Sequence, residues 1–184
     1  MTTDGSAPSV PDWTALIRDV PDFPEPGVMF KDISLLLADP HAFATIIGLL
    51  ADAGRDESGR PVVNKVAGIE ARGFILAAPV AMALGAGLVA VRKAGKLPRA
   101  TYSESYALEY GQATLEIHTD ALGVGDRVLI VDDVLATGGT VEATTRLVAS
   151  SGALVTGVAV LIELGALNGR ERLASLPLRA LTVV

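Results

Sequence analysis

One stretch, residues 127–140, constrains the fold of this chain more than any other part of the sequence. It begins with the apolar run Val-Leu-Ile-Val at 128–131, and an uninterrupted apolar run is typical of a parallel strand buried on both faces. Two carboxylates, Asp132 and Asp133, follow the run, and an apolar-periodic helix is expected after Thr140. This order of elements predicts an open α/β sheet, in which ligands bind beyond the carboxyl ends of the strands.

The turn between this strand and the helix has the chemistry of a phosphate site. It consists of Ala136, Thr137, Gly138, Gly139 and Thr140. Backbone N–H groups at a helix N-terminus carry partial positive charge, glycine lets the backbone approach a ligand, and threonine adds hydroxyl donors. The two preceding carboxylates can accept hydrogen bonds from a sugar diol. These groups together predict a site for a phosphorylated ribose, against the alternative of a capped strand–turn–helix without a ligand.

Composition excludes several other classes of protein. The 184 residues suit one domain with a sizeable core, and a net charge of −6 argues against bulk binding to nucleic acid or to an anionic membrane. The chain has no cysteine and only two histidines, so neither disulfides nor a zinc site are expected. No apolar run is long enough to span a membrane, and the first ten residues do not resemble a secretory signal. A cytoplasmic protein is therefore expected.

The remaining sequence alternates between apolar runs and helical periodicity, which predicts a doubly wound, mainly parallel α/β sheet. Residues 1–11 are expected to be a disordered tail, residues 12–184 a single domain, and the polar stretch 97–111 a flexible loop. Further strands are expected near 65–69, 88–91, 112–118, 154–162 and 178–183, and helices near 12–20, 40–50, 74–84, 141–151 and 168–174.

Two other strand ends carry residues suited to binding anions. Glu70-Ala71-Arg72-Gly73 lies between a strand and a helix, where Arg72 and backbone N–H groups can grip a pyrophosphate; a salt bridge at a helix start is the plainer alternative. The next strand ends in a cluster of three cations, which favours contact with a polyanion over a merely solvated basic patch. These cations are Arg92, Lys93 and Lys96.

The 127–140 stretch resembles the phosphoribosyl pyrophosphate (PRPP) signature of the type I phosphoribosyltransferases. Residues 22–33, 68–74, 92–98 and 106–111 are similar to motifs of the adenine phosphoribosyltransferase family, in the family's order. The resemblance implies the type I fold with a small N-terminal hood at about 21–34. It also implies purine salvage, in which adenine and PRPP give AMP and pyrophosphate with Mg²⁺, and a homodimer that binds no nucleic acid and no membrane.

The resemblance also assigns roles to single residues. It implies catalytic roles for Glu109 and Arg72, and it implies that Mg²⁺ is held mainly through PRPP and water rather than by a metal site of the protein. The residues implied to bind PRPP are Glu70, Ala71, Arg92, Lys93, Lys96, Tyr110, Asp132, Asp133, Ala136, Thr137, Gly138, Gly139 and Thr140. Those implied to bind adenine are Val28, Met29, Phe30, Lys31 and Leu164. A cis peptide bond is implied between Glu70 and Ala71.

Three alternatives stay open at the level of the sequence. A transferase for 6-oxopurines such as xanthine or guanine would usually place a cationic donor near the last core strand, where this chain has Glu163-Leu164-Gly165. A non-catalytic PRPP-sensing regulator would keep the phosphate loop and usually add a DNA-binding segment, which is not visible here. Glu109 is either the base that takes a proton from adenine or a residue that only helps a loop to close.

Overall fold

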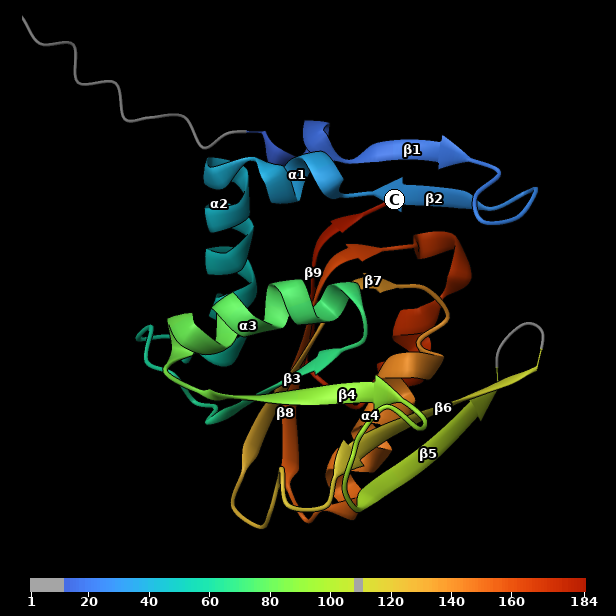
Figure 1. Cartoon of the computed structure of the whole chain (residues 1–184). Coiled ribbons are helices and arrows are strands. Elements are labelled where there is room, and N and C mark those ends of the chain that lie inside the picture. The colour runs from blue at the N-terminus through green and yellow to red at the C-terminus, as the bar shows by residue number, and fades with distance from the viewer. Residues whose placement is uncertain (1–11, 108–110) are drawn as a thin grey trace, which may run out of the picture. The chain divides into compact units, whose positions relative to one another are not determined.

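The computed structural model describes residues 12–107 and 111–184 (Figure 1). The tail expected at 1–11 and the predicted site residues Glu109 and Tyr110 lie outside the described residues. The chain divides into two compact units between Ile46 and Ile47.

The first unit consists of short helices and a two-stranded hairpin. A 3₁₀ helix, η1 (Trp13–Leu16), begins after Asp12, whose carboxylate accepts a 3.2 Å hydrogen bond from the Thr14 N–H. The strands β1 (Arg18–Pro21) and β2 (Met29–Asp32) then pair antiparallel, and α1 (Ser34–Ala38) follows them. The helix expected up to residue 20 therefore ends early. Pro21 disfavours helical geometry in the residue before it, and residues 18–21 pair with β2 instead.

Helix α2 (Pro40–Ala51) begins in the first unit and ends in the second. Asp39 caps it as the sequence predicts, because its carboxylate accepts hydrogen bonds from the N–H groups of His41 (2.9 Å) and Ala42 (2.8 Å). Pro40 occupies the first turn, where its missing N–H costs nothing. None of the helices in the described part of the chain has the length and apolar character needed to cross a bilayer.

A seven-stranded sheet forms the second unit, and it confirms the predicted mainly parallel α/β fold. Five strands run parallel in the spatial order β4-β3-β7-β8-β9, and β6 and β5 extend the β4 edge in antiparallel pairs. The strands are β3 (Lys65–Ile69), β4 (Gly87–Lys93), β5 (Thr101–Ala107), β6 (Gln112–His118), β7 (Arg127–Leu135), β8 (Leu154–Glu163) and β9 (Leu178–Val183). The order reverses between β3 and β7, and such a switch point opens a crevice beyond the strand ends.

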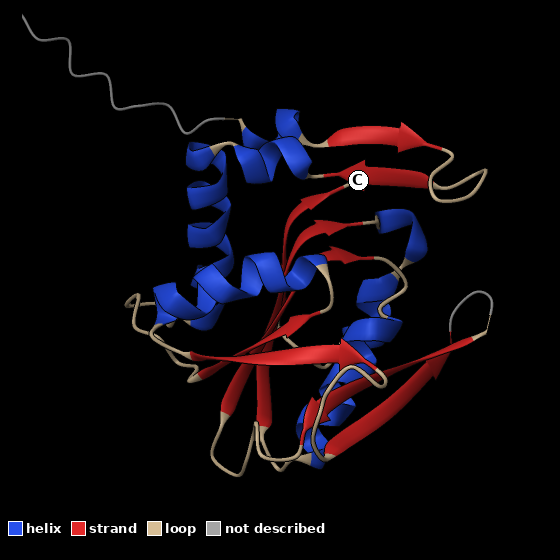
Figure 2. Ribbon diagram, viewed as in Figure 1, coloured by secondary structure: helices blue, strands red, loops and turns tan. Residues whose placement is uncertain are grey.

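Helices cover both faces of this sheet (Figure 2). Helix α4 (Gly139–Ser150) packs its apolar residues against one set of alternating strand residues, which includes Ile69 and Ile130. On the opposite face lies α3 (Arg72–Leu84), and a Cβ added to Gly68 would come 2.6 Å from the Ala77 Cβ. The 3₁₀ helices η2 (Asp52–Gly54), η3 (Gly165–Leu167) and η4 (Gly169–Leu173) complete the described elements.

The stretch predicted as a loop at 97–111 is a strand over much of its length. Residues 101–107 form β5, which pairs with β6 along its whole length. Burial alternates along this stretch, as it does in a strand with one face toward the core. Tyr102, Glu104 and Tyr106 are partly buried, while the serines between them are exposed. Both tyrosines pack against the core beneath α4. The flexibility expected of this stretch stays a prediction.

Candidate functional site

The two predicted sugar-binding carboxylates lie inside β7 rather than after its end. The strand continues to Leu135, so Asp132 and Asp133 are held by the sheet on a rigid backbone, and both are buried. One carboxylate oxygen of Asp132 accepts a 2.9 Å hydrogen bond from the Asp133 N–H. Burial, and then the neighbouring charge of Asp133, raises the pKa of Asp132 well above its usual range. The pair is thus a fixed acceptor site in which ionisation of Asp132 is disfavoured.

The loop after β3 reaches these carboxylates, as the switch-point geometry requires. Arg72 Nη2 lies 2.7 Å from Asp133 Oδ2, and the Glu70–Ala71 peptide bond is cis, as the resemblance implies. Gly73 permits this approach, because a Cβ at that position would lie 2.7 Å from Asp132 Oδ1. The structure therefore brings together the two strand ends that the sequence marks as anion and sugar sites.

Of the predicted phosphate loop at 136–140, residues 136–138 precede α4, and Gly139 and Thr140 form the start of the helix. Gly138 is the N-cap of the helix and has a φ of +80°, a left-handed conformation that favours glycine. A small cavity of about 60 Å³ opens here, and its lining includes Thr137, Gly138 and Thr140. A helix N-terminus with a hollow beside it fits an anion such as a phosphate group.

A glycine that the sequence reasoning missed packs against this loop. A Cβ on Gly169 would lie 2.1 Å from the Ala136 carbonyl oxygen and 2.9 Å from the Gly138 nitrogen. Conversely, a Cβ on Gly138 would lie 2.6 Å from the Gly169 carbonyl oxygen. The only available signal was the pair Asn168-Gly169, a turn-favouring dipeptide that does not indicate which loop it contacts.

Glu70 organises the predicted pyrophosphate-binding cations. Its buried carboxylate lies 3.3 Å from Arg92 Nε, accepts a 3.0 Å hydrogen bond from the Lys93 N–H and forms an ion pair with Lys96. The hydrogen bond from Lys96 is the first cause of the lowered pKa of Glu70. Glu70 thus connects the end of β3 to the end of β4 and partly neutralises two of the cations.

The residues predicted to bind adenine lie in both units. Val28 and Met29 are exposed at the start of β2, and the Phe30 ring meets Phe23 edge-on with ring centroids 5.0 Å apart. Lys31 Nζ lies 2.6 Å from Asp19 Oδ1, across the hairpin. Leu164, in the second unit, follows β8 and donates its N–H to the Leu135 carbonyl oxygen at 2.9 Å. Their role toward adenine stays a prediction.

The residues of the site suit a Mg²⁺ ion that is bound mainly by the PRPP molecule. Among the residues that the structure describes, no group of three or more histidine, cysteine or acidic side chains could hold a metal ion. Mg²⁺ typically keeps several waters and binds through one or two carboxylates together with substrate phosphates. Asp132 and Asp133 can supply that number of carboxylates, and a Mg²⁺ held mainly by PRPP and water stays a prediction.

Comparison with known proteins supports this chemistry. The family model described as "Phosphoribosyl transferase domain" matches residues 33–175. Over 185 aligned residues the chain is 62% identical to the adenine phosphoribosyltransferase of Nocardioides sp. (strain ATCC BAA-499 / JS614), with 100% of both chains covered. This chain belongs to the adenine phosphoribosyltransferase family.

Solved structures of the family share its fold. The adenine phosphoribosyltransferase of Rhodothermus marinus matches with a TM-score of 0.87 and 51% identity, covering 94% of this chain and 96% of that one. The enzyme of Giardia lamblia, in complex with 9-deazaadenine, matches with a TM-score of 0.88 and 40% identity, covering 97% and 99%. The type I phosphoribosyltransferase fold predicted from the sequence is therefore confirmed.

Proposed function

We propose that this chain transfers the 5-phosphoribosyl group from PRPP to adenine and releases AMP and pyrophosphate. The observation that carries the proposal is the meeting of the Arg72 loop with the Asp132–Asp133 strand, next to a phosphate-sized turn at the start of α4. The arrangement offers a cation, two sugar-binding acceptors and an anion site, in the order in which PRPP presents pyrophosphate, ribose and 5′-phosphate. Its relatives carry the same activity in their names.

The proposed reaction breaks the bond between ribose C1 and the pyrophosphate oxygen and forms a bond between C1 and an adenine nitrogen. Asp132 and Asp133 hold the ribose hydroxyls, and residues 136–140 hold the 5′-phosphate. Arg72, with Arg92, Lys93 and Lys96, stabilises negative charge on the departing pyrophosphate. Bound Mg²⁺ would supply further charge neutralisation at the pyrophosphate. Tyr110 is proposed to contact PRPP as well.

Adenine must lose a ring proton as its nitrogen attacks, and Glu109 is proposed to take that proton. Val28, Met29, Phe30 and Lys31 are proposed to bind the base, with Leu164 packing on its ring. The family often has arginine where this chain has Lys31, so a planar two-pronged contact is not proposed there. Neither a 6-oxopurine transferase nor a PRPP-sensing regulator gains support from any observation above.

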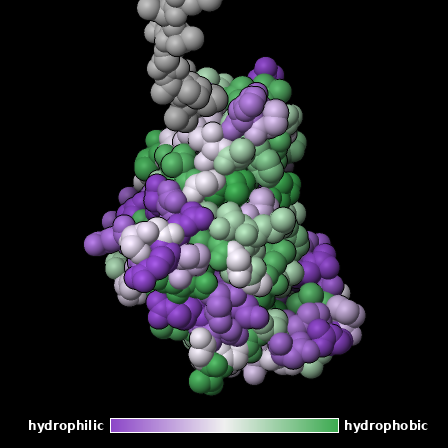
Figure 3. All heavy atoms as spheres, turned by 90° about the vertical axis from the view of Figure 1, so that its left-hand side faces the viewer, coloured by the Kyte–Doolittle hydropathy of each residue, from purple (hydrophilic) through white to green (hydrophobic). Residues whose placement is uncertain are grey.

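We further propose a cytoplasmic homodimer. Exposed apolar side chains on one face of the sheet support self-association: Ile75 and Met82 lie seven residues apart on α3, and Leu88 points to the same side from β4. Leu88 points there because its neighbour Val89 faces the core beneath α4. Hydrophobic residues are also exposed in patches between hydrophilic ones on the face drawn in Figure 3.

The proposed function is tested by a PRPP-dependent assay with adenine, hypoxanthine, guanine and xanthine, measured with and without Mg²⁺. We expect AMP formation from adenine at a much higher kcat/KM than for any 6-oxopurine, and loss of turnover when the metal is chelated. Comparable turnover of hypoxanthine or guanine would assign the chain to the 6-oxopurine enzymes. PRPP binding without turnover of any base would instead favour the regulator.

A further inference from the structure

We propose that Arg170 and Glu163 position the loop that holds the 5′-phosphate, acting through the backbone of Gly169. This inference rests on the proposed function and assigns to η4 a role that neither the sequence motifs nor the reaction scheme gave it. The two residues are positioning residues, since they touch the loop's supporting segment rather than the substrate.

The first step is the contact between Gly169 and the loop. The Cβ positions built at Gly169 and Gly138 lie 2.1 Å from the Ala136 oxygen and 2.6 Å from the Gly169 oxygen, respectively. At such distances the two backbones pack directly, with no side chain between them to absorb a shift. Any movement of Gly169 therefore moves residues 136–138, whose N–H groups must point at a bound phosphate.

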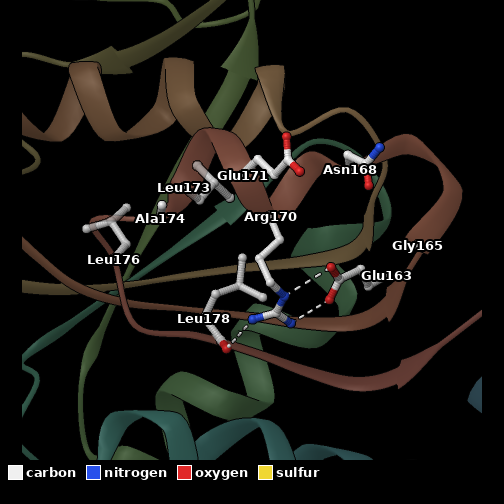
Figure 4. A pocket seen from close by; sticks show the side chains of 9 residues that line it. All are labelled: Glu163, Gly165, Asn168, Arg170, Glu171, Leu173, Ala174, Leu176 and Leu178. Atoms are coloured by element: carbon white, nitrogen blue, oxygen red, sulfur yellow. Dashed lines mark hydrogen bonds and ion pairs between the residues drawn. The ribbon is translucent and has the colours of Figure 1, made fainter.

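The second step is the fixation of Gly169 by the residue that follows it. Arg170 Nε and Nη2 donate to the two carboxylate oxygens of Glu163 at 3.1 and 2.5 Å, and Nη1 donates to the Leu178 carbonyl at 3.2 Å (Figure 4). A planar guanidinium that meets a carboxylate with two parallel bonds fixes orientation as well as distance. The hydrogen bond to Glu163 also raises the pKa of Arg170.

The third step is the connection between Glu163 and the start of the loop. Glu163 ends β8, where it pairs in register with Leu135, the last residue of β7 before the loop. The Leu164 N–H donates to the Leu135 carbonyl at 2.9 Å and secures the same strand end. The contacts therefore form a closed circuit. It runs from Leu135 through the loop to Gly169, and then through Arg170 and Glu163 back to Leu135. The strand ends at Leu135 and Glu163 thus fix the loop at its start and, through Gly169, along its backbone.

The burial pattern distinguishes this pair from ordinary surface charge. The Glu163 side chain is only 7% exposed, whereas that of Arg170 is 49% exposed. Burying a carboxylate costs free energy unless the carboxylate is paired. Apolar residues of similar volume would stabilise the fold at least as well as the buried ion pair does. The pair also lines a cavity of about 530 Å³.

The experiment compares ligands that contain the 5′-phosphate with one that does not. Arg170→Lys keeps the positive charge but removes the planar guanidinium and its two parallel hydrogen bonds. Glu163→Gln keeps the shape of the side chain but removes its charge. Gly169→Ala places a methyl group against the backbone of the loop. The control is Arg179→Lys on β9, whose partner Asp52 lies 4.0 Å away. Calorimetry with AMP and with magnesium pyrophosphate, thermal unfolding, and KM values for PRPP and adenine are measured for each protein.

We expect the three variants to bind AMP roughly 10- to 100-fold more weakly while their affinity for pyrophosphate changes less than about twofold, since a small misplacement of a positioning group costs this much. The KM for PRPP should rise while that for adenine stays constant, and Arg179→Lys should change none of these values.

Folded variants with unchanged AMP affinity, or with equal losses of affinity for AMP and for pyrophosphate, overturn the inference. Because the side chain of Arg170 is half exposed, Arg170→Lys supplies a folded variant if Gly169→Ala unfolds. Wild-type protein that binds no AMP would instead overturn the proposed function.

Discussion

Arg72 Nη2 lies 2.7 Å from Asp133 Oδ2, so an ion pair joins the loop after β3 to the strand that carries both acidic residues. The same cation lowers the pKa of Asp132, although burial and Asp133 outweigh it. Arg72 is therefore expected to act on two parts of the proposed site: it is proposed to contact the pyrophosphate, and it favours the ionised form of Asp132.

Replacing Arg72 by glutamine should affect both parts. We expect kcat/KM for PRPP to fall by about 10²- to 10³-fold, as for loss of one preorganised donor to a developing charge. The acidic limb of the pH–rate profile should move to higher pH, because Asp132 loses a nearby cation that lowers its pKa. Steady-state kinetics between pH 5 and 9 measure both effects. Arg60→Gln, which removes an exposed cation paired with Asp56, is the control and should change neither.

Replacing Asp132 by asparagine should stabilise the fold at neutral pH. The pKa of Asp132 is raised by folding, so its contribution to stability is fully present below the unfolded value of about 3.9 and is lost as pH rises through the folded value. Asparagine avoids this loss. The variant should melt at least about 2 °C above wild type at pH 8, with the difference vanishing toward pH 4, while activity with PRPP falls.

The control for that series is Asp120→Asn. Asp120 is exposed and its pKa is lowered, chiefly by Arg99, so its contribution is present above the unfolded pKa and lost as pH falls. A small effect of the opposite sign is therefore expected at pH 8. If Asp132→Asn lowers the melting temperature at neutral pH, burial does not disfavour the ionised form of that carboxylate.

Glu109→Gln tests the proposed proton acceptor. Glutamine keeps the size and hydrogen bonding of the side chain but removes its basicity, so kcat should fall by roughly 10²- to 10⁴-fold with little change in the KM for PRPP. Single-turnover measurements must show that chemistry limits the rate. Retention of more than about a third of kcat would leave Glu109 with a role in loop closure alone. Glu57→Gln, in the exposed connection between η2 and β3, serves as the comparison.

Met82→Glu tests the proposed homodimer. The Met82 side chain is 83% exposed on α3, and a charge placed in an apolar interface must be desolvated on association. We expect wild-type protein to sediment as a dimer and the variant to shift toward monomer with an unchanged melting profile at low concentration. Leu154→Glu, an exposed apolar position on β8, should leave the dimer intact. Wild-type protein that is monomeric at all concentrations refutes the proposal.

The sequence allowed the sheet, the phosphate turn and the Arg72 loop to be predicted, because local patterns specify them. Apolar runs marked β3 and β8 almost to the residue, whereas β7 continues beyond its apolar run to Leu135, and Gly138 adopts the positive φ that a glycine-rich turn implies. The sequence predicts a loop where the structure has β5, since the alternating face of this strand is tyrosine and glutamate rather than aliphatic. Gly169 could not be assigned to the phosphate loop, because a contact between backbones far apart in sequence leaves no local pattern.

The division of the chain between Ile46 and Ile47 has a consequence for how this family can diversify. Four of the five residues proposed to bind the base belong to the first unit, whereas the groups proposed to hold the phosphoribose belong to the second. Substitutions in the β1–β2 hairpin can therefore change which base is accepted without altering any residue that grips the sugar phosphate. Exchanging that hairpin among relatives is the natural starting point for engineering transfer to non-natural nucleobases.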